Sequence, residues 1–288
     1  MSRKRMARKR MSRGWMLLPL LGLAVLSACG RGNAPDRDAA GTAAPGAAAT
    51  GTVGQAAEAP VVLEDVMQRD PRYLIGISYP PAAKAYPGLA KLLKAYADAA
   101  RADVMQAVSG LGDTRPTAPY DLALDFSMLA ETPDIVAVAA RGSSYTGGAH
   151  GNPLVARFVW LPKRNEALTA ARLVPVPDDW KPIADAVREE LVAGLSARLD
   201  AAAPAPADRA EMLRNGSRMI DDGTAPTASN FDQFEPLLGP DGRIRALRFV
   251  FPPYQVGPYS DGVQSVEVPA AVLLPLVAPD YRGLFEGG

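Results

Sequence analysis

The apolar and polar positions that follow residue 70 predict two strands separated by a helix. Large apolar residues stand at every second position from Tyr73 to Tyr79, and the same alternation returns from Leu122 to Met128. This period is typical of strands with one buried face. After Pro87, a residue favoured in the first turn of a helix, apolar residues recur at helical spacing. The helical stripe consists of Leu89, Leu92, Leu93, Tyr96, Ala100 and Val104.

The next part of the chain predicts a hairpin of two central strands and a second helix. Residues 135–140 and 154–161 are apolar runs of strand length joined by a Gly-rich turn. Apolar residues at helical spacing then run through 180–195, and Pro182 is tolerated in the first turn of that helix. The carboxylates of Asp178-Asp179 are expected to cap it.

The last third predicts a weak helix and a second hairpin. An Ala-, Pro- and Asp-rich loop at 201–208 precedes a short helical patch that is interrupted at Asn215-Gly216. A strand at 231–238 then turns through 239–242 and returns with Arg248 facing outward. A final strand at 263–268 and a short helix at 271–277 complete the chain.

Hairpin-length connections and half-polar strands favour an α+β fold, a mainly antiparallel sheet with two principal helices packed against it. A parallel βαβ fold fits less well, because a glycine-rich strand-to-helix turn of the dinucleotide-binding kind is missing from the sequence. We expect residues 61–288 to form the α+β ligand-binding region, with an N-terminal part at 61–130 and a core at 131–288.

A basic and then apolar leader precedes this region. Seven Lys and Arg residues lie before Trp15, an apolar run follows, and Leu26-Ser27-Ala28-Cys29 closes it. This order is that of a secretion signal, and the run is shorter than the roughly 20 residues that span a bilayer. It resembles the signal peptide of bacterial lipoproteins, in which the cysteine becomes the first mature residue and carries acyl chains.

The leader therefore predicts a signal peptide at 1–28, palmitate on Cys29 and a flexible Ala/Gly/Pro tether at 29–60. Because Gly30 rather than aspartate follows the cysteine, we expect a lipoprotein of the cell envelope at the periplasmic face of the outer membrane. A free thiol at Cys29 is the alternative.

Without its leader the chain is acidic. The whole chain carries 31 basic and 31 acidic residues, and removing the seven basic residues of the leader leaves 24 against 31, a mature net charge of −7. An acidic surface repels phosphate backbones, which argues against nucleic acid as a partner and favours a basic one.

The turn at 143–152 holds the single histidine of the chain, His150, beside Tyr145 and a pair of glycines. His150 could act as a general base or as a contact residue. The simpler interpretation is that Gly147-Gly148 supplies positive φ in a tight turn while His150 hydrogen-bonds the backbone nearby.

The residue pattern does not indicate a catalytic triad or a metal site. A Ser143 or Ser144 triad with His150 lacks a nucleophile elbow, and neither a zinc ligand set nor alternating calcium ligands are present. We therefore expect no metal, no cofactor and no enzyme.

The second informative segment is 251–262, where aromatic residues alternate with Pro and Gly. Tyr254 and Tyr259 could form a recognition surface, because tyrosine gives a large contact area at a small entropic cost. They could equally be core tyrosines that fix a loop to the sheet.

Residues 145–151, Tyr-Thr-Gly-Gly-Ala-His-Gly, together with Phe251-x-x-Tyr254-x-Val256-x-Pro258-Tyr259-x-x-Gly262, resemble the two signatures of the RsiV-type extracytoplasmic domain. In that family the domain is the outer part of a lysozyme-sensing anti-sigma factor, and it also stands beside the catalytic domain of some peptidoglycan deacetylases. The resemblance covers residues 135–281. It implies an α+β binding module whose candidate surface is Tyr145, His150, Tyr254 and Tyr259.

Two departures shape the expected function. Only a short basic leader precedes Trp15, unlike an anti-sigma factor, and the chain stops at Gly288 with one histidine, unlike a deacetylase. We expect a membrane-anchored module that binds or inhibits a basic envelope protein such as a lysozyme-like muramidase. The alternatives are a small envelope hydrolase that uses His150 as base and a scaffold that binds peptidoglycan.

Overall fold

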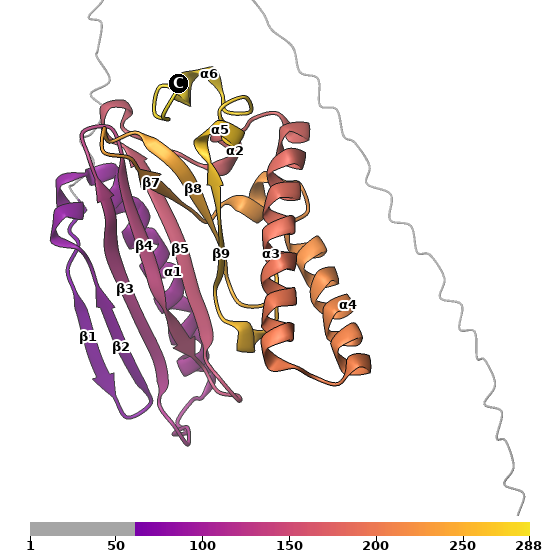
Figure 1. Cartoon of the computed structure of the whole chain (residues 1–288). Helices are drawn as coiled ribbons and strands as arrows, with labels where there is room; N and C mark the ends of the chain where they lie inside the picture. Colours follow the sequence, from indigo (N-terminus) through magenta and orange to yellow (C-terminus); the bar gives the residue numbers. More distant parts are fainter. Residues whose placement is uncertain (1–60) are drawn as a thin grey trace, which may run out of the picture. The chain divides into compact units, whose positions relative to one another are not determined.

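The structure is a computed structural model that describes residues 61–288 (Figure 1). The predicted signal peptide, Cys29 and the predicted tether lie outside the described residues. Within 61–288 the chain forms two sheets and several helices, a mixed α+β fold as predicted, although the prediction had a single sheet and two principal helices. The subdivision at residue 130 stays a prediction.

The larger sheet has six strands in the order of the chain. Its strands are β1 (Val66–Asp70), β2 (Tyr73–Ser78), β3 (Tyr120–Glu131), β4 (Val136–Tyr145), β5 (Asn152–Leu161) and β6 (Glu166–Ala167). The predicted strands are confirmed, and β4 and β5 form the predicted hairpin in the interior of the sheet. The sequence analysis missed β1, because this edge strand is nowhere fully buried and its alternation is broken by Arg69 and Asp70.

One pair of neighbours in this sheet is parallel. Strands β2 and β3 run in the same direction, and the chain crosses between them through α1 (Pro87–Gly110). The larger sheet is therefore not wholly antiparallel, and it contains a βαβ unit that the hairpin signals elsewhere had argued against. A parallel pair needs such a long crossover, whereas the other pairs of this sheet are antiparallel.

The smaller sheet follows the predicted second hairpin. It consists of β7 (Phe234–Leu238), β8 (Ile244–Phe251) and β9 (Gln264–Pro269), all antiparallel. Phe231, expected at the start of the first strand, lies instead in a 3₁₀ turn and is fully buried against Trp180. The expected helix at 271–277 is only α5 (Ala270–Leu273), and α6 (Pro279–Arg282) follows it.

A long helix packs on the smaller sheet, and a second long helix packs on the first (Figure 1). The predicted helix is α3 (Trp180–Ala202), but Asp179 at its N-cap makes no side-chain capping bond because it already has helical dihedral angles. The next helix, α4 (Pro206–Gly223), runs without a break through Asn215-Gly216, contrary to the prediction. A Cβ on Gly216 would lie 2.6 Å from Leu195 Cδ2, so this glycine allows close packing of α4 on α3.

The core lies in two clusters on opposite faces of β4 and β5. On one face, Val136, Val138 and Trp160 pack with α1, and on the other, Ala137 and Val159 pack with α3 and the smaller sheet. A strand buried on both faces reads as a continuous apolar run, which is why 135–140 gave so clear a signal. This central hairpin carries the turn that holds His150. Among the helices of 61–288, none is long and apolar enough to cross a membrane.

Replacing Gly88 with alanine is expected to destabilise the protein. A Cβ there would lie 2.2 Å from the Trp160 ring, so either that ring or α1 must shift, at a cost of about 1–3 kcal/mol. The matched control is Gly110→Ala at the other end of the same helix, where a Cβ meets nothing within 4 Å. Urea unfolding should show a loss for Gly88→Ala and no loss for Gly110→Ala. Equal midpoints would contradict the packing described.

Candidate functional site

Three of the four predicted surface residues meet in one aromatic cluster. The rings of His150 and Tyr259 are stacked with centroids 4.2 Å apart, and the Tyr254 ring lies 5.7 Å from that of Tyr259. The three side chains are exposed, Tyr254 to 55% and Tyr259 to 39%. Tyr254 and Tyr259 therefore are not core residues, and the tyrosines of one loop meet the histidine of another.

Both ring nitrogens of His150 have hydrogen-bonding partners. Nδ1 lies 3.0 Å from the Gly151 carbonyl oxygen, which can only accept, so Nδ1 donates, and in the neutral imidazole Nε2 then accepts from the Tyr254 hydroxyl at 3.2 Å. The hydrogen bonds of residues 61–288 include none from His150 to a serine or a carboxylate. The triad written with Ser143 or Ser144 is therefore not assembled.

The β4–β5 turn positions His150 through its glycines. Gly147 and Gly148 have φ of 101° and 104°, values that glycine adopts without the strain of a side chain. The Tyr145 hydroxyl donates to the Gly148 carbonyl oxygen at 3.2 Å, so Tyr145 braces the turn. The segment is thus a tight turn in which His150 hydrogen-bonds the neighbouring backbone.

The β8–β9 loop that carries the tyrosines is anchored at several points. The Gln255 side chain donates to the Gly223 and Asn230 carbonyl oxygens at 3.0 and 2.9 Å, Val256 is buried, and Asp261 forms an ion pair with Arg198 at 3.3 Å. A loop held in this way loses little conformational freedom when it binds a partner.

Tyr254 holds a strained backbone conformation in this loop. The Gln255 N–H donates to the Pro252 carbonyl oxygen at 3.1 Å, closing a turn in which Pro253 is second and Tyr254 third. Tyr254 has a φ of 75°, where a type II turn normally places glycine. Strain of this kind persists where the surroundings fix the residue, and it is concentrated at functional sites.

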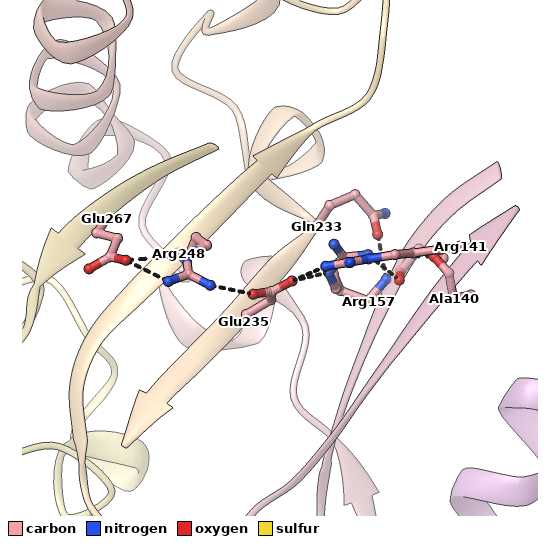
Figure 2. Close-up of polar contacts among 8 residues, drawn as sticks. Ala140, Arg141, Arg157, Gln233, Glu235, Arg248 and Glu267 are labelled. Atoms are coloured by element: carbon pink, nitrogen blue, oxygen red, sulfur yellow. Dashed lines mark hydrogen bonds and ion pairs between the residues drawn. The ribbon is translucent and has the colours of Figure 1, made fainter. Parts of the chain in front are cut away.

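A chain of charged residues links the two sheets (Figure 2). Arg157 of β5 donates through Nε to Glu235 Oε1 of β7 at 2.6 Å, and both side chains are nearly fully buried. Arg248 of β8 contacts Glu235 Oε2 at 3.2 Å and Glu267 of β9 at 2.6 Å. Arg141 of β4 approaches Glu235 only to 3.9 Å.

Further polar contacts complete the buried pair. The Arg157 Nη1 donates to the Ala156 carbonyl oxygen at 2.9 Å, and its backbone N–H donates to Gln233 Oε1 at 2.7 Å. Burial lowers the pKa of Arg157, while the Glu235 carboxylate opposes that change. The pKa of Arg248 is raised, chiefly by its hydrogen bond to Glu267.

This network was not predicted from the sequence, where Arg248 was expected to face outward. The Arg248 side chain is 37% exposed and bound between two carboxylates. Register explains the arrangement, because Arg248 lies opposite both Glu235 and Glu267 in the smaller sheet. The pairing of β7 with β8 was predicted, but the contact to Arg157, 78 positions away from Glu235, left no local signal.

The described residues offer no ready metal site. Within 61–288 there is no group of three or more His, Cys, Asp and Glu side chains that could hold a metal ion.

Comparisons with known proteins identify a domain without an assigned activity. Residues 183–271 match the family described as "Protein of unknown function (DUF3298)", a segment that includes Tyr254 and Tyr259 but not His150. A DUF3298 family protein from Pseudomonas aeruginosa PAO1 is similar in structure, with 17% identity, a TM-score of 0.49, and coverage of 78% of this chain and 97% of that one.

A second DUF3298 family member, from Bacteroides fragilis NCTC 9343, has 16% identity and a TM-score of 0.47, covering 75% of this chain and 89% of its own. A search of curated proteins gives no match.

Glu235→Ala is expected to lower the free energy of unfolding by about 3–5 kcal/mol, because it leaves the buried Arg157 without its counter-charge. The control is Glu267→Ala at the exposed end of the network, with an expected loss below about 1 kcal/mol. Denaturant unfolding measures both. Equal losses in the two variants would refute the assignment of Arg157–Glu235 as the structural pair.

Tyr254→Gly is expected to be more stable than Tyr254→Ala by about 1 kcal/mol, since both variants remove the ring but only glycine relieves the left-handed backbone. Thermal unfolding of the two variants gives the difference directly. If alanine proved the more stable replacement, the strain at Tyr254 would be absent in solution.

Proposed function

We propose that this chain is an envelope lipoprotein, attached to the outer membrane through acylated Cys29, that binds or inhibits a basic envelope protein. A lysozyme-like muramidase is the concrete candidate. The observation that carries the proposal is the exposed cluster of His150, Tyr254 and Tyr259 on two anchored loops. Rigid, exposed aromatic side chains are the usual anchors of protein interfaces. The finer resemblance of the two loop sequences to the RsiV-type domain supports a muramidase as the partner.

Charge supports the same class of partner. Leaving out the nine basic and three acidic residues of 1–60, the 31 of each kind become 22 basic and 28 acidic residues, a net charge of −6. Complementary charge speeds the encounter with a basic protein and weakens as salt screens it. The acidic side chains need not lie at the binding surface for this effect, because the long-range electric field of the protein depends on its net charge.

The contacts of His150 favour a binding role over a catalytic one. A general base must reach the proton that it removes, and in this site the imidazole is held between a tyrosine hydroxyl and a main-chain carbonyl. In the proposed function His150 orients Tyr254 by a hydrogen bond and Tyr259 by stacking.

A peptidoglycan-binding scaffold is the second candidate, and the same exposed tyrosines favour it, since aromatic faces also present flat apolar surface to sugars. Pull-down of the full chain with purified sacculi separates the two functions. Retention on sacculi that is lost in Tyr254→Ala and Tyr259→Ala would favour the scaffold.

Tyr259→Ala is expected to weaken binding to a lysozyme by tenfold or more, about 1.4 kcal/mol or above, because a central aromatic anchor is lost. Titration calorimetry with the full chain at low salt measures the effect. The control is Met212→Ala on α4, an apolar side chain of similar exposure (51%) outside the cluster, which should bind as the parent does.

Raising the ionic strength should weaken the parent's binding. Absence of any interaction at low salt would contradict a muramidase partner, and equal effects of Tyr259→Ala and Met212→Ala would contradict the assigned surface.

A further inference from the structure

A cavity of about 400 Å³ lies between the face of the β4–β5 hairpin and the segment that enters β9. Its polar lining is Arg141 and Arg157. Its apolar walls are Pro153, Leu154, Val155 and Val263. The residues that line it therefore bring two guanidinium groups and no carboxylate to an apolar surface.

Arg141 has hydrogen-bonding capacity to spare. Glu235 already receives Arg157 on Oε1 at 2.6 Å and Arg248 on Oε2 at 3.2 Å, so Arg141 comes no nearer than 3.9 Å. The Arg141 side chain is 66% exposed. A guanidinium carries five N–H donors in a planar fork, and no hydrogen bond from the Arg141 side chain is found within residues 61–288.

The carboxylate opposite Arg141 forms no ion pair with it among the described residues. Asp125 lies opposite Arg141 in the pairing of β3 with β4. Its carboxylate instead accepts a hydrogen bond of 2.5 Å from the Ser78 hydroxyl, and the ion pairs of residues 61–288 include none between Asp125 and Arg141.

The inter-sheet network has a positive excess at this point. It joins the guanidinium groups of Arg141, Arg157 and Arg248 to the carboxylates of Glu235 and Glu267, three positive charges against two negative ones. Because the other two arginines are bound closely to carboxylates, Arg141 is the member of this network whose guanidinium has, within residues 61–288, no carboxylate nearer than 3.9 Å, with Asp125 opposite it in the sheet.

We propose that this cavity binds a small organic carboxylate that carries a short apolar tail. One spare guanidinium matches the single charge and planar geometry of a carboxylate, which it can hold through two parallel N–H bonds. The apolar walls formed by Val155, Pro153 and Val263 would cover the tail. The cavity is of the size typical for small-ligand sites. This inference does not depend on the proposed partner protein, since the cavity lining includes neither Tyr254 nor Tyr259.

The full chain is titrated with octanoate, and binding is measured by calorimetry or by ligand-observed NMR. Octanoate should bind saturably, whereas octanamide, which has the same tail without charge, and inorganic phosphate, which has charge without a tail, should bind at least about tenfold more weakly. Binding of octanamide as tight as that of octanoate, tighter binding of phosphate, or no saturable octanoate binding would overturn the proposal.

Two matched pairs of variants locate the site. Arg141→Gln should weaken octanoate binding about tenfold or more, while Arg218→Gln, the same change at an exposed position on α4, should leave it unchanged. Val263→Asp should abolish binding by placing a carboxylate in the wall, while Val272→Asp on α5 should not. The side chains changed are at least 40% exposed or lie on the surface, so the fold should persist, which circular dichroism checks. Octanoate binding that survives both Arg141→Gln and Val263→Asp would place the ligand elsewhere.

Discussion

The buried contact between Arg157 and Glu235 is the constraint on which the arrangement of the two sheets depends. Apolar packing between sheets is non-directional, so it fixes separation better than it fixes orientation. A charged pair joined at 2.6 Å with both partners buried tolerates little displacement, because a loss of contact would leave two desolvated charges unpaired. The backbone and side chain of Arg157 are both held, by Gln233, Ala156 and Glu235. The pair thereby sets the position of β7 over β5.

The aromatic cluster depends on that position. His150 stands at the tip of the β4–β5 hairpin in the larger sheet, and Tyr254 and Tyr259 stand on the loop that joins two strands of the smaller sheet. A stack of 4.2 Å between rings from different sheets requires the two sheets to keep a fixed relation. The strained φ of Tyr254 fits the same account, since the anchors of Gln255 and Val256 hold the loop in a conformation that its sequence alone would not favour.

Much of the fold followed from periodicity alone. In the strands buried on one face, apolar and polar residues alternate, and the strands of the central hairpin are continuous apolar runs. In α1 and α3, apolar residues recur at helical spacing. These elements were therefore predicted close to their observed positions. The failures have physical causes. The edge strand β1 buries too little to show a pattern, the parallel pairing of β2 with β3 depends on long-range contacts, and Gly216 looked like a break although Leu195 fills the space beside it. His150 and the two tyrosines lie in two segments that stand out in the sequence, but that their rings meet, like the Arg157–Glu235 pair, is visible only in the tertiary structure.

If the buried Arg157–Glu235 pair holds the two loops in their relative positions, the ring of the single histidine reports on that pair. Stacking on Tyr259 should shift the ring protons of His150 upfield in the proton NMR spectrum, and the chain's one histidine makes their assignment unambiguous. In Glu235→Gln, which weakens the buried pair, these resonances should move toward the values of an unstacked imidazole, while in Glu267→Gln they should stay in place. A folded Glu235→Gln variant with unchanged His150 ring shifts would contradict the account.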